Sequence, residues 1–453
     1  MYTRKTDSVA DPRERQLLEG RGPQPAFALI KMTRTLVFFC LMAVPVCAAF
    51  RASVVKVDIT PNTPKWLLGY GPRQSTGVHD PIFHRIVAMD DGEKKFLMVS
   101  TDLCLFSPTV YDDVARRIEK ATGIPPVRFW WTVTHTHSAP EVGPPGVYKV
   151  LLKGRSEHPV DTEYTERISS SLVAGAKEAL AKLEPARLAM GTGMSMANIN
   201  RRALDVDGKT SLGLNPDGPV DRQIGLLRLE KANGSPLALI ANYAMHGTVL
   251  SGQFMEISGD AQGIVAAYVE QKFGAPMLYI NGAAGNIAPI YSVYPTPRAG
   301  HLTQFNVLLG DRILAANGAM GAATSEVKID AAEKWVDTPR KQGMDWPEDL
   351  PEYSRTGPNG RAMVRLPIRF LKLNDTVIWS APVELFCEIS FHVRNHSPFA
   401  NTFYFGYTNG WIGYLPTKAG FAAGGYEPTT SVFSDQVEQD VTEAVVAYLQ
   451  GWR

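Results

Sequence analysis

The sequence has almost no net charge, since 46 lysines and arginines are balanced by 45 aspartates and glutamates over 453 residues. A chain that holds nucleic acid by its phosphates needs a basic excess, so we expect no nucleic-acid partner. The same balance argues against electrostatic docking to a membrane. Hydrophobic residues make up 45% of the chain and charged residues 20%, which excludes a disordered or fibrous protein and predicts a large globular core.

Cysteine is scarce, with only 4 in the whole chain: Cys40, Cys47, Cys104 and Cys387. None shows the spacing of a zinc finger, so any bound metal must be held by histidine and carboxylate side chains. Cys104 and Cys387 either pair in an oxidising compartment or remain separate buried thiols.

Long apolar runs are also scarce. The apolar run 36–47 is too short for a membrane span, which needs about 20 residues. It follows the basic segment 32–34 and ends in small residues at 48–49, a pattern typical of a secretory signal peptide that is cleaved after Ala49. A short membrane anchor is the alternative interpretation.

We therefore expect residues 1–49 to comprise an upstream extension and the signal peptide, with the true start at Met32. The protein would then be secreted or periplasmic. Residues 50–453 would form one catalytic domain without a stable membrane span, and its oligomeric state is left open.

Residues 50–453 alternate between predicted strands and predicted helices. We expect strands at residues 52–57, 86–89, 96–100, 127–134, 226–229, 237–243 and 277–280. We expect helices at residues 110–122, 163–183, 262–273 and 436–449, and long loops at 140–159 and 341–361. This alternation predicts an α/β (mixed α+β) fold, with mixed β-sheets flanked by helices in a single large domain.

The densest group of reactive side chains is Thr134-His135-Thr136-His137-Ser138-Ala139-Pro140, at the end of the predicted strand 127–134. Alternate residues of a strand face the same side, so we expect His135 and His137 to point into one cavity. Such a pair is suited to metal binding or acid–base chemistry, and two structural histidines are the alternative. His246 follows another predicted strand and carries the same two interpretations.

A loop of small residues, 281–289, follows the predicted strand 277–280. Its backbone amides either bind an anion or simply form a tight turn. It lacks the spacing and the lysine of a P-loop, and the chain has no G-x-S-x-G elbow, which argues against an α/β-hydrolase.

The segment Thr134 to Pro140 resembles the T-H-T-H-S-G-P motif of the neutral/alkaline (non-lysosomal) ceramidases. Further segments resemble other landmarks of that family in the same chain order: Asp58-Ile59-Thr60-Pro61 with Gly69-Tyr70, Asn198-Ile199-Asn200-Arg201, Met245-His246-Gly247-Thr248, Ser258-Gly259-Asp260, Pro382-Val383-Glu384-Leu385, and Asn409 to Tyr414 with Tyr426-Glu427. The resemblance covers roughly residues 52–430, nearly the whole chain after the expected signal peptide.

This resemblance implies a catalytic Zn²⁺ with a specific set of ligands: His135, His246, Glu384 and Tyr414. Zinc with one open position lowers the pKa of water towards 7 and prepares it for attack. The resemblance also places His137 and Arg201 beside the metal, to polarise the amide carbonyl and to stabilise the oxyanion. Asp260 is a candidate for protonating the leaving amine, with helix capping as its alternative role.

The function implied is that of a zinc-dependent hydrolase. It would cleave the amide bond of an N-acyl lipid such as ceramide by attack of zinc-bound water, giving a sphingoid base and a fatty acid. One alternative is a zinc amidase or esterase that acts on another N-acylated or glycan-linked substrate. Another is a non-catalytic binding protein of the same fold.

The sequence departs from the family pattern at three places. Ala288 stands where the family carries a serine with a catalytic role, so a serine nucleophile is not expected here. Val383, rather than glycine, precedes Glu384. Ceramidases continue into a C-terminal immunoglobulin-like domain, and we expect none in this chain, which ends at Arg453.

Overall fold

The structure is a computed structural model that describes residues 50–291 and 299–452. The expected signal peptide and the start at Met32 lie outside the described residues. They stay predictions, as does the domain boundary at residue 50.

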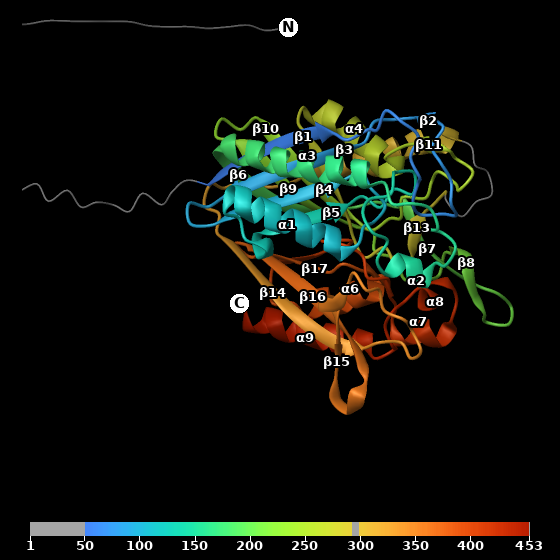
Figure 1. Ribbon diagram of the computed structural model, residues 1–453. Coiled ribbons are helices and arrows are strands. Elements are labelled where there is room, and N and C mark those ends of the chain that lie inside the picture. Colours follow the sequence, from blue (N-terminus) through green and yellow to red (C-terminus); the bar gives the residue numbers. More distant parts are fainter. Residues whose placement is uncertain (1–49, 292–298, 453) are drawn as a thin grey trace, which may run out of the picture. The chain divides into compact units, whose positions relative to one another are not determined.

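A sheet of 8 strands carries most of the predicted elements, in the order β12-β10-β9-β6-β1-β3-β4-β5 (Figure 1). Its strands are β1 (Arg51–Asp58), β3 (Phe83–Asp90), β4 (Lys95–Thr101), β5 (Phe129–Val133), β6 (Glu184–Met194), β9 (Gln223–Lys231), β10 (Pro236–Tyr243) and β12 (Met277–Asn281). The pairs β4–β5 and β10–β12 are parallel and the other pairs are antiparallel, so the sheet is mixed.

Helices cover one face of this sheet: α1 (Pro108–Thr122), α3 (Thr162–Ala181), α4 (Asp260–Phe273) and α5 (Asp311–Gly318). Strand β3 shows why both faces are apolar. Ile86 packs in the cluster that contains the α1 and α3 side chains, whereas Val87 packs in a separate cluster with Phe403 and Phe405 of the second sheet. A strand that is buried on both sides reads as a continuous apolar run, which is why β3 and β4 were predictable from the sequence.

The second sheet has 5 strands in all, in the order β14-β16-β17-β19, with β15 paired to β16. Its strands are β14 (Ile329–Pro339), β15 (Ser354–Thr356), β16 (Ala362–Leu373), β17 (Thr376–Ser380) and β19 (Asn401–Phe405). Helices α6 (Cys387–His396) and α9 (Val437–Gly451) lie on its outer face. The layers therefore run helix, sheet, sheet, helix, which confirms the predicted α/β fold with mixed sheets flanked by helices (Figure 1).

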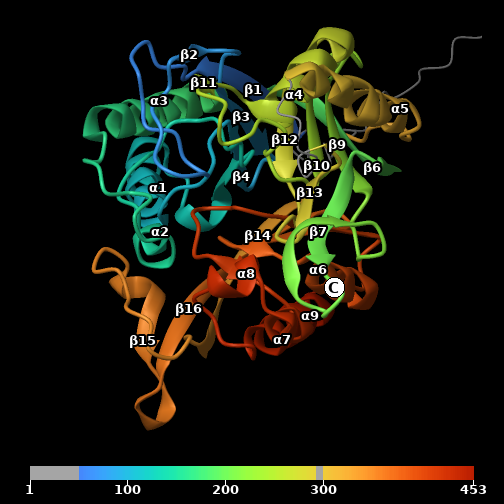
Figure 2. The same ribbon diagram turned by 90° about the vertical axis from the view of Figure 1, so that its right-hand side faces the viewer.

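Short elements fill the region where the connecting loops of both sheets meet, and β7 and β13 lie there between the layers (Figure 2). The short strands are β2 (Gly77–Val78), β7 (Asn198–Leu204), β8 (Thr210–Asn215), β11 (Glu256–Ile257), β13 (Ile287–Pro289), β18 (Glu384–Leu385) and β20 (Tyr414–Leu415). The short helices are α2 (Val147–Leu151), α7 (Lys418–Ala423) and α8 (Tyr426–Thr429). Short 3₁₀ helices occur at Pro126–Arg128, Ala299–Gln304, Pro351–Tyr353 and Pro358–Gly360, and a π-helical turn occurs at Asn306–Gly310.

The predicted strands and helices are all present, with ends shifted by a few residues. The two stretches predicted as loops are more ordered than expected, because 140–159 contains α2 and 341–361 contains β15. No strand of the second sheet was predicted.

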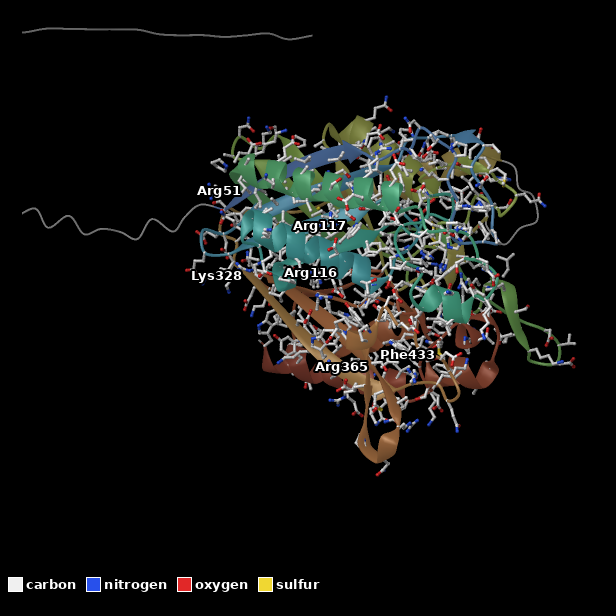
Figure 3. All side chains as sticks on the ribbon, in the orientation of Figure 1. Arg51, Arg116, Arg117, Lys328, Arg365 and Phe433 are labelled. Atoms are coloured by element: carbon white, nitrogen blue, oxygen red, sulfur yellow. The ribbon has the colours of Figure 1, made fainter. Side chains whose placement is uncertain are left out.

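The outer face of α1 carries exposed charged side chains. Arg116 and Arg117 project from α1 (Figure 3), and Arg117 forms an ion pair with Glu166 of α3 at 2.7 Å. In the part of the chain that the structure describes, no helix combines the length and the apolar character needed to cross a membrane. Cys104 and Cys387 are both buried and unpaired, so the disulfide interpretation is wrong and that of separate thiols holds.

Candidate metal centre

His135 and His246 are brought together by two chain segments that run side by side. Thr136 and Gly247, the residues directly after the two histidines, form a parallel bridge. The side chain of Asn281, at the end of β12, donates to the carbonyls of the residues directly before them, Thr134 at 3.3 Å and Met245 at 2.9 Å. The two segments therefore hold the histidines at equivalent positions.

Gly247 makes this close approach possible. A Cβ at this position would lie 2.4 Å from the carbonyl oxygen of His135, much closer than atoms pack. Any residue with a side chain would therefore force the two histidine segments apart.

His135 and His137 were predicted to point into one cavity because alternate residues of a strand face the same side. The two side chains do point into one site, but the reason given for it is wrong. Strand β5 ends at Val133, and His135 has a left-handed backbone with φ of 65°, so strand alternation no longer applies there. The two side chains nevertheless point into one site, where their Nε2 atoms lie 3.2 Å apart.

Backbone carbonyls set the orientation of both buried rings. His135 Nδ1 lies 2.9 Å from the carbonyl oxygen of Cys104, and His246 Nδ1 lies 2.8 Å from that of Ala284. A carbonyl only accepts, so each Nδ1 carries the proton and each Nε2 presents its lone pair to the site. This is the arrangement of metal-binding histidines, whose second nitrogen is fixed by an outer partner.

Glu384 completes a compact group of donor atoms. Its Oε2 lies 3.4 Å from His135 Nε2 and 3.0 Å from His246 Nε2, and all three side chains are buried. Ligand atoms of these residues all lie within 4.8 Å of one another, a group able to hold a metal ion. Burial by itself raises the pKa of Glu384, but the neighbouring His135 and His246 hold it well below its usual range, so the carboxylate is charged.

Tyr414 reaches the same group from β20. It is the register partner of Glu384 in the parallel pair β18–β20, and its hydroxyl lies 3.3 Å from His246 Nε2. Nitrogen and oxygen atoms of this kind are the ligands that zinc prefers, although phenol is an uncommon one. All four residues expected to bind zinc (His135, His246, Glu384 and Tyr414) therefore converge, and their chemistry fits such an ion.

His137 lies between this group of donor atoms and residues 69–73. Burial, together with His135 and His246, lowers the pKa of His137 well below its usual value, so the ring is neutral. The ring of Tyr70 packs edge-on against it with centroids 5.0 Å apart, and Arg73 donates to its backbone carbonyl. Gly69, with φ of 106°, leaves room for the ring: a Cβ there would lie 2.4 Å from His137 Cγ.

Arg201 of β7 joins the group through Tyr414. One guanidinium nitrogen donates to the Tyr414 hydroxyl at 3.0 Å and Nε donates to Glu427 at 3.0 Å. Burial lowers the pKa of Arg201, but the oxygens of Tyr414 and Glu427 outweigh it and raise the pKa, so the charge is retained. Glu427 also pairs with Arg202. In the sequence, Glu427 was noted only within the segment Tyr426-Glu427 that resembles the ceramidases, and no role was predicted for it.

Asp260 faces backbone amides and has no hydrogen bond to the histidines among the described residues. Its carboxylate accepts from Val249 at 3.2 Å, from Leu250 at 3.0 Å and from Ala261 at 2.6 Å. It thus binds one first-turn amide of α4 and also holds the loop that follows His246. Burial raises its pKa to about 6.

The small-residue loop 281–289 presents carbonyls to the site rather than amides. Ala284 and Ile287 accept from His246 Nδ1 through their carbonyl oxygens, while the Gly285 amide donates to Leu385 at 2.8 Å. The loop therefore orients His246, and the Gly285 amide is not free for an anion. Ala288 is buried in β13 opposite Ile199 of β7.

Comparison with known proteins identifies the family. Residues 50–289 match the family described as neutral/alkaline non-lysosomal ceramidase, N-terminal. The chain belongs to this family. The match contains His135, His137, Arg201 and His246, and it ends before Glu384.

Curated ceramidases are distant relatives of the chain. Neutral ceramidase B of Dictyostelium discoideum is 29% identical over 225 residues, which is 46% of this chain and 30% of the relative. Neutral ceramidase of Pseudomonas aeruginosa is 26% identical over 258 residues, 54% of this chain and 38% of the relative. The chain thus spans about a third of the length of these ceramidases.

The fold is that of solved ceramidases. The crystal structure of neutral ceramidase from Pseudomonas aeruginosa has a TM-score of 0.72 and 19% identity, covering 88% of this chain and 73% of that one. A structure titled as a ceramidase complexed with C2 has a TM-score of 0.71 and 17% identity, covering 88% of this chain and 74% of the other. The similarity extends past residue 289 and confirms a ceramidase-like fold.

Proposed function

We propose that this ceramidase-family chain is a zinc-dependent amidohydrolase that cleaves the amide bond of an N-acyl lipid of the ceramide type. The products would be a sphingoid base and a fatty acid. The observation that carries the proposal is the convergence of His135 Nε2, His246 Nε2 and Glu384 Oε2 in a buried group of ligand atoms. Membership of the ceramidase family supports the choice of an amide as the bond that is cleaved.

Two features support a metal at this group. Lone pairs on His135 Nε2 and His246 Nε2 and one carboxylate oxygen of Glu384 face each other in a buried group, an arrangement that a cation among them would stabilise. The Nδ1 atoms are already bound to carbonyls. Zinc held by these residues would supply a Lewis acid and lower the pKa of water towards 7.

Arg201 and His137 are suited to act on the amide carbonyl. Arg201 keeps its charge and lies against the Tyr414 hydroxyl, so it can stabilise negative charge that develops on the carbonyl oxygen. A neutral His137 carries one ring N–H and one lone pair, and the N–H can donate to the same oxygen. Asp260 stays a candidate for the proton of the leaving amine. Its raised pKa of about 6 brings the protonated carboxyl closer to neutral pH than for an ordinary aspartate, and its oxygens accept from backbone amides.

Ala288 favours one alternative, a binding protein that has lost turnover, because alanine lacks the hydroxyl of the family's serine. We propose instead that water is the nucleophile and that no covalent acyl-enzyme forms. We also propose that the protein is exported, which fits a lipid substrate outside the cytoplasm.

The test is hydrolysis of a panel of N-acyl amides and esters, ceramide included, by the mature chain before and after chelation. We expect turnover that chelation abolishes and that zinc restores. His246→Ala should be inactive, while His392→Ala, at an exposed histidine of α6, should match the wild type. Zinc binding without turnover on any substrate would favour the binding protein, and cleavage of other substrates but not ceramide would favour a different amidase or esterase.

A further inference from the structure

Both carboxylate oxygens of Glu384 are held by side chains from one loop, residues 406–413. The Tyr407 hydroxyl donates to Oε2 at 3.2 Å, and the Trp411 indole nitrogen donates to Oε1 at 2.9 Å. All three side chains are buried. Rotation of the carboxylate would break at least one of these bonds in a place where water cannot replace it. Glu384 is therefore fixed with Oε2, rather than Oε1, facing the histidines.

Tyr407 also contacts a second candidate ligand. Its ring stacks on the ring of His135 with centroids 4.1 Å apart and planes at 24°. One side chain therefore sets the position of a histidine through its ring and of Glu384 through its hydroxyl.

The backbone of this loop is strained, and its surroundings hold it in place. Tyr407 and Asn409 adopt left-handed conformations with φ of 53° and 64°, which are unfavourable for residues with side chains. Asn409 exchanges two hydrogen bonds with Trp131 of β5: its amide donates to the Trp131 carbonyl at 2.7 Å, and its side-chain oxygen accepts from the Trp131 amide at 2.7 Å. The loop is thus attached to the strand that leads into His135.

We propose that Tyr407 and Trp411 are positioning residues for the metal centre, holding Glu384 so that only Oε2 is presented to the ion. The proposal rests on the proposed function in one respect, namely that the site takes zinc. A carboxylate that its neighbours already hold in place loses little conformational entropy when the ion binds. This gain in binding free energy can offset the strain in the backbone of the loop. Neither residue needs to touch the metal itself.

The experiment measures the zinc dissociation constant of the mature chain by competition with a chelator, for Tyr407→Phe and Trp411→Phe. Loss of an outer partner of a ligand weakens metal binding by about 10–100-fold, and we expect that range for each variant. Tyr407→Phe keeps the ring that stacks on His135, so its effect isolates the hydroxyl.

Two control variants lose equivalent groups elsewhere. Tyr164→Phe removes a buried hydroxyl that donates to the Ile59 carbonyl at 2.9 Å, and Trp346→Phe removes an indole N–H that donates to Leu350 at 2.7 Å. We expect both controls to bind zinc as the wild type does. Urea unfolding of the metal-free proteins reports any general loss of stability, which should be similar in a test variant and its control.

The possible results separate the two proposals. Weaker zinc binding in Tyr407→Phe and Trp411→Phe, with unchanged binding in the controls, supports the positioning role. Wild-type affinity in both test variants overturns that role and leaves the zinc hydrolase standing. No zinc binding by the wild type overturns the proposed function, and the positioning role with it.

Discussion

Glu384 and Tyr414 face each other as register partners in the parallel pair β18–β20, and each places an oxygen against Nε2 of His246. Two candidate ligands from distant parts of the chain are therefore set by one two-residue strand pair. His135 and His246 are set by a second pairing, the bridge between Thr136 and Gly247. The donor group is thus held by backbone pairing on both sides.

The first prediction concerns metal content. We expect about one zinc per chain in the purified mature protein, measured by plasma emission, because four nitrogen and oxygen ligands suffice for this ion. Glu384→Ala should lose the metal, and Tyr414→Phe should bind it more weakly. Glu388→Ala, at a glutamate in the first turn of α6, serves as the control and should retain it. Full zinc occupancy in Glu384→Ala would contradict the proposed ligand set.

The second prediction concerns Gly69. Gly69→Ala places a Cβ 2.4 Å from His137 Cγ at a position with φ of 106°, so we expect a loss of about 1–3 kcal/mol in the free energy of unfolding. Gly71→Ala is the control, since nothing lies within 4 Å of its added Cβ, and it should change stability by less than about 0.5 kcal/mol. Urea titration measures both. Equal stability of the two variants would show that the His137 ring has room to move.

The third prediction concerns Arg201. If its guanidinium stabilises the oxyanion, Arg201→Ala should lower kcat by about 10²–10³-fold in the hydrolysis assay. Arg202 still pairs with Glu427 in this variant, so the carboxylate keeps a partner and the fold should persist. Arg187→Ala removes a half-buried arginine that pairs with Glu230 and should leave kcat unchanged. A rise in KM with constant kcat would instead assign Arg201 to substrate binding.

The fourth prediction concerns pH. Burial raises the pKa of Asp260 to about 6 in the folded protein, above its ordinary value in an unfolded chain. The folded state therefore binds this proton more tightly than the unfolded state does. Proton binding by Asp260 adds its full contribution to the free energy of unfolding below about pH 4, and this contribution is lost as the pH rises through about 6. Relative to Asp260→Asn, the wild type should lose up to about 3 kcal/mol across this window. Urea titrations of both proteins at several pH values measure it, and a constant difference would contradict the shift.

The fifth prediction concerns export. A secretory signal peptide that ends at Ala49 gives a mature protein whose first residue is Phe50. N-terminal sequencing of the protein recovered from the periplasm or the medium measures this directly. Recovery only from the membrane fraction, with residues 36–47 retained, would support the membrane anchor instead.

The sequence by itself determined the elements whose signal is local. Apolar runs such as those of β3 and β4, and the glycine-ended helix α4, are visible because burial on both faces and capping leave a pattern within a few residues. The His135 and His137 motif was visible for the same reason. Glu384 and Tyr414 were reached only through the resemblance to ceramidases. Strand β14 of the second sheet was missed because it mixes buried with exposed residues and gives no clean alternation.

Only the tertiary structure decided how these parts form a site. The bridge between Thr136 and Gly247, the left-handed backbone of His135 and the hold of Tyr407 and Trp411 on Glu384 all depend on contacts between residues far apart in the chain. Such contacts leave no local pattern, because strand register and side-chain orientation are settled by packing of the whole core. The residue types predict what chemistry is possible here, and the long-range pairing decides which atoms meet.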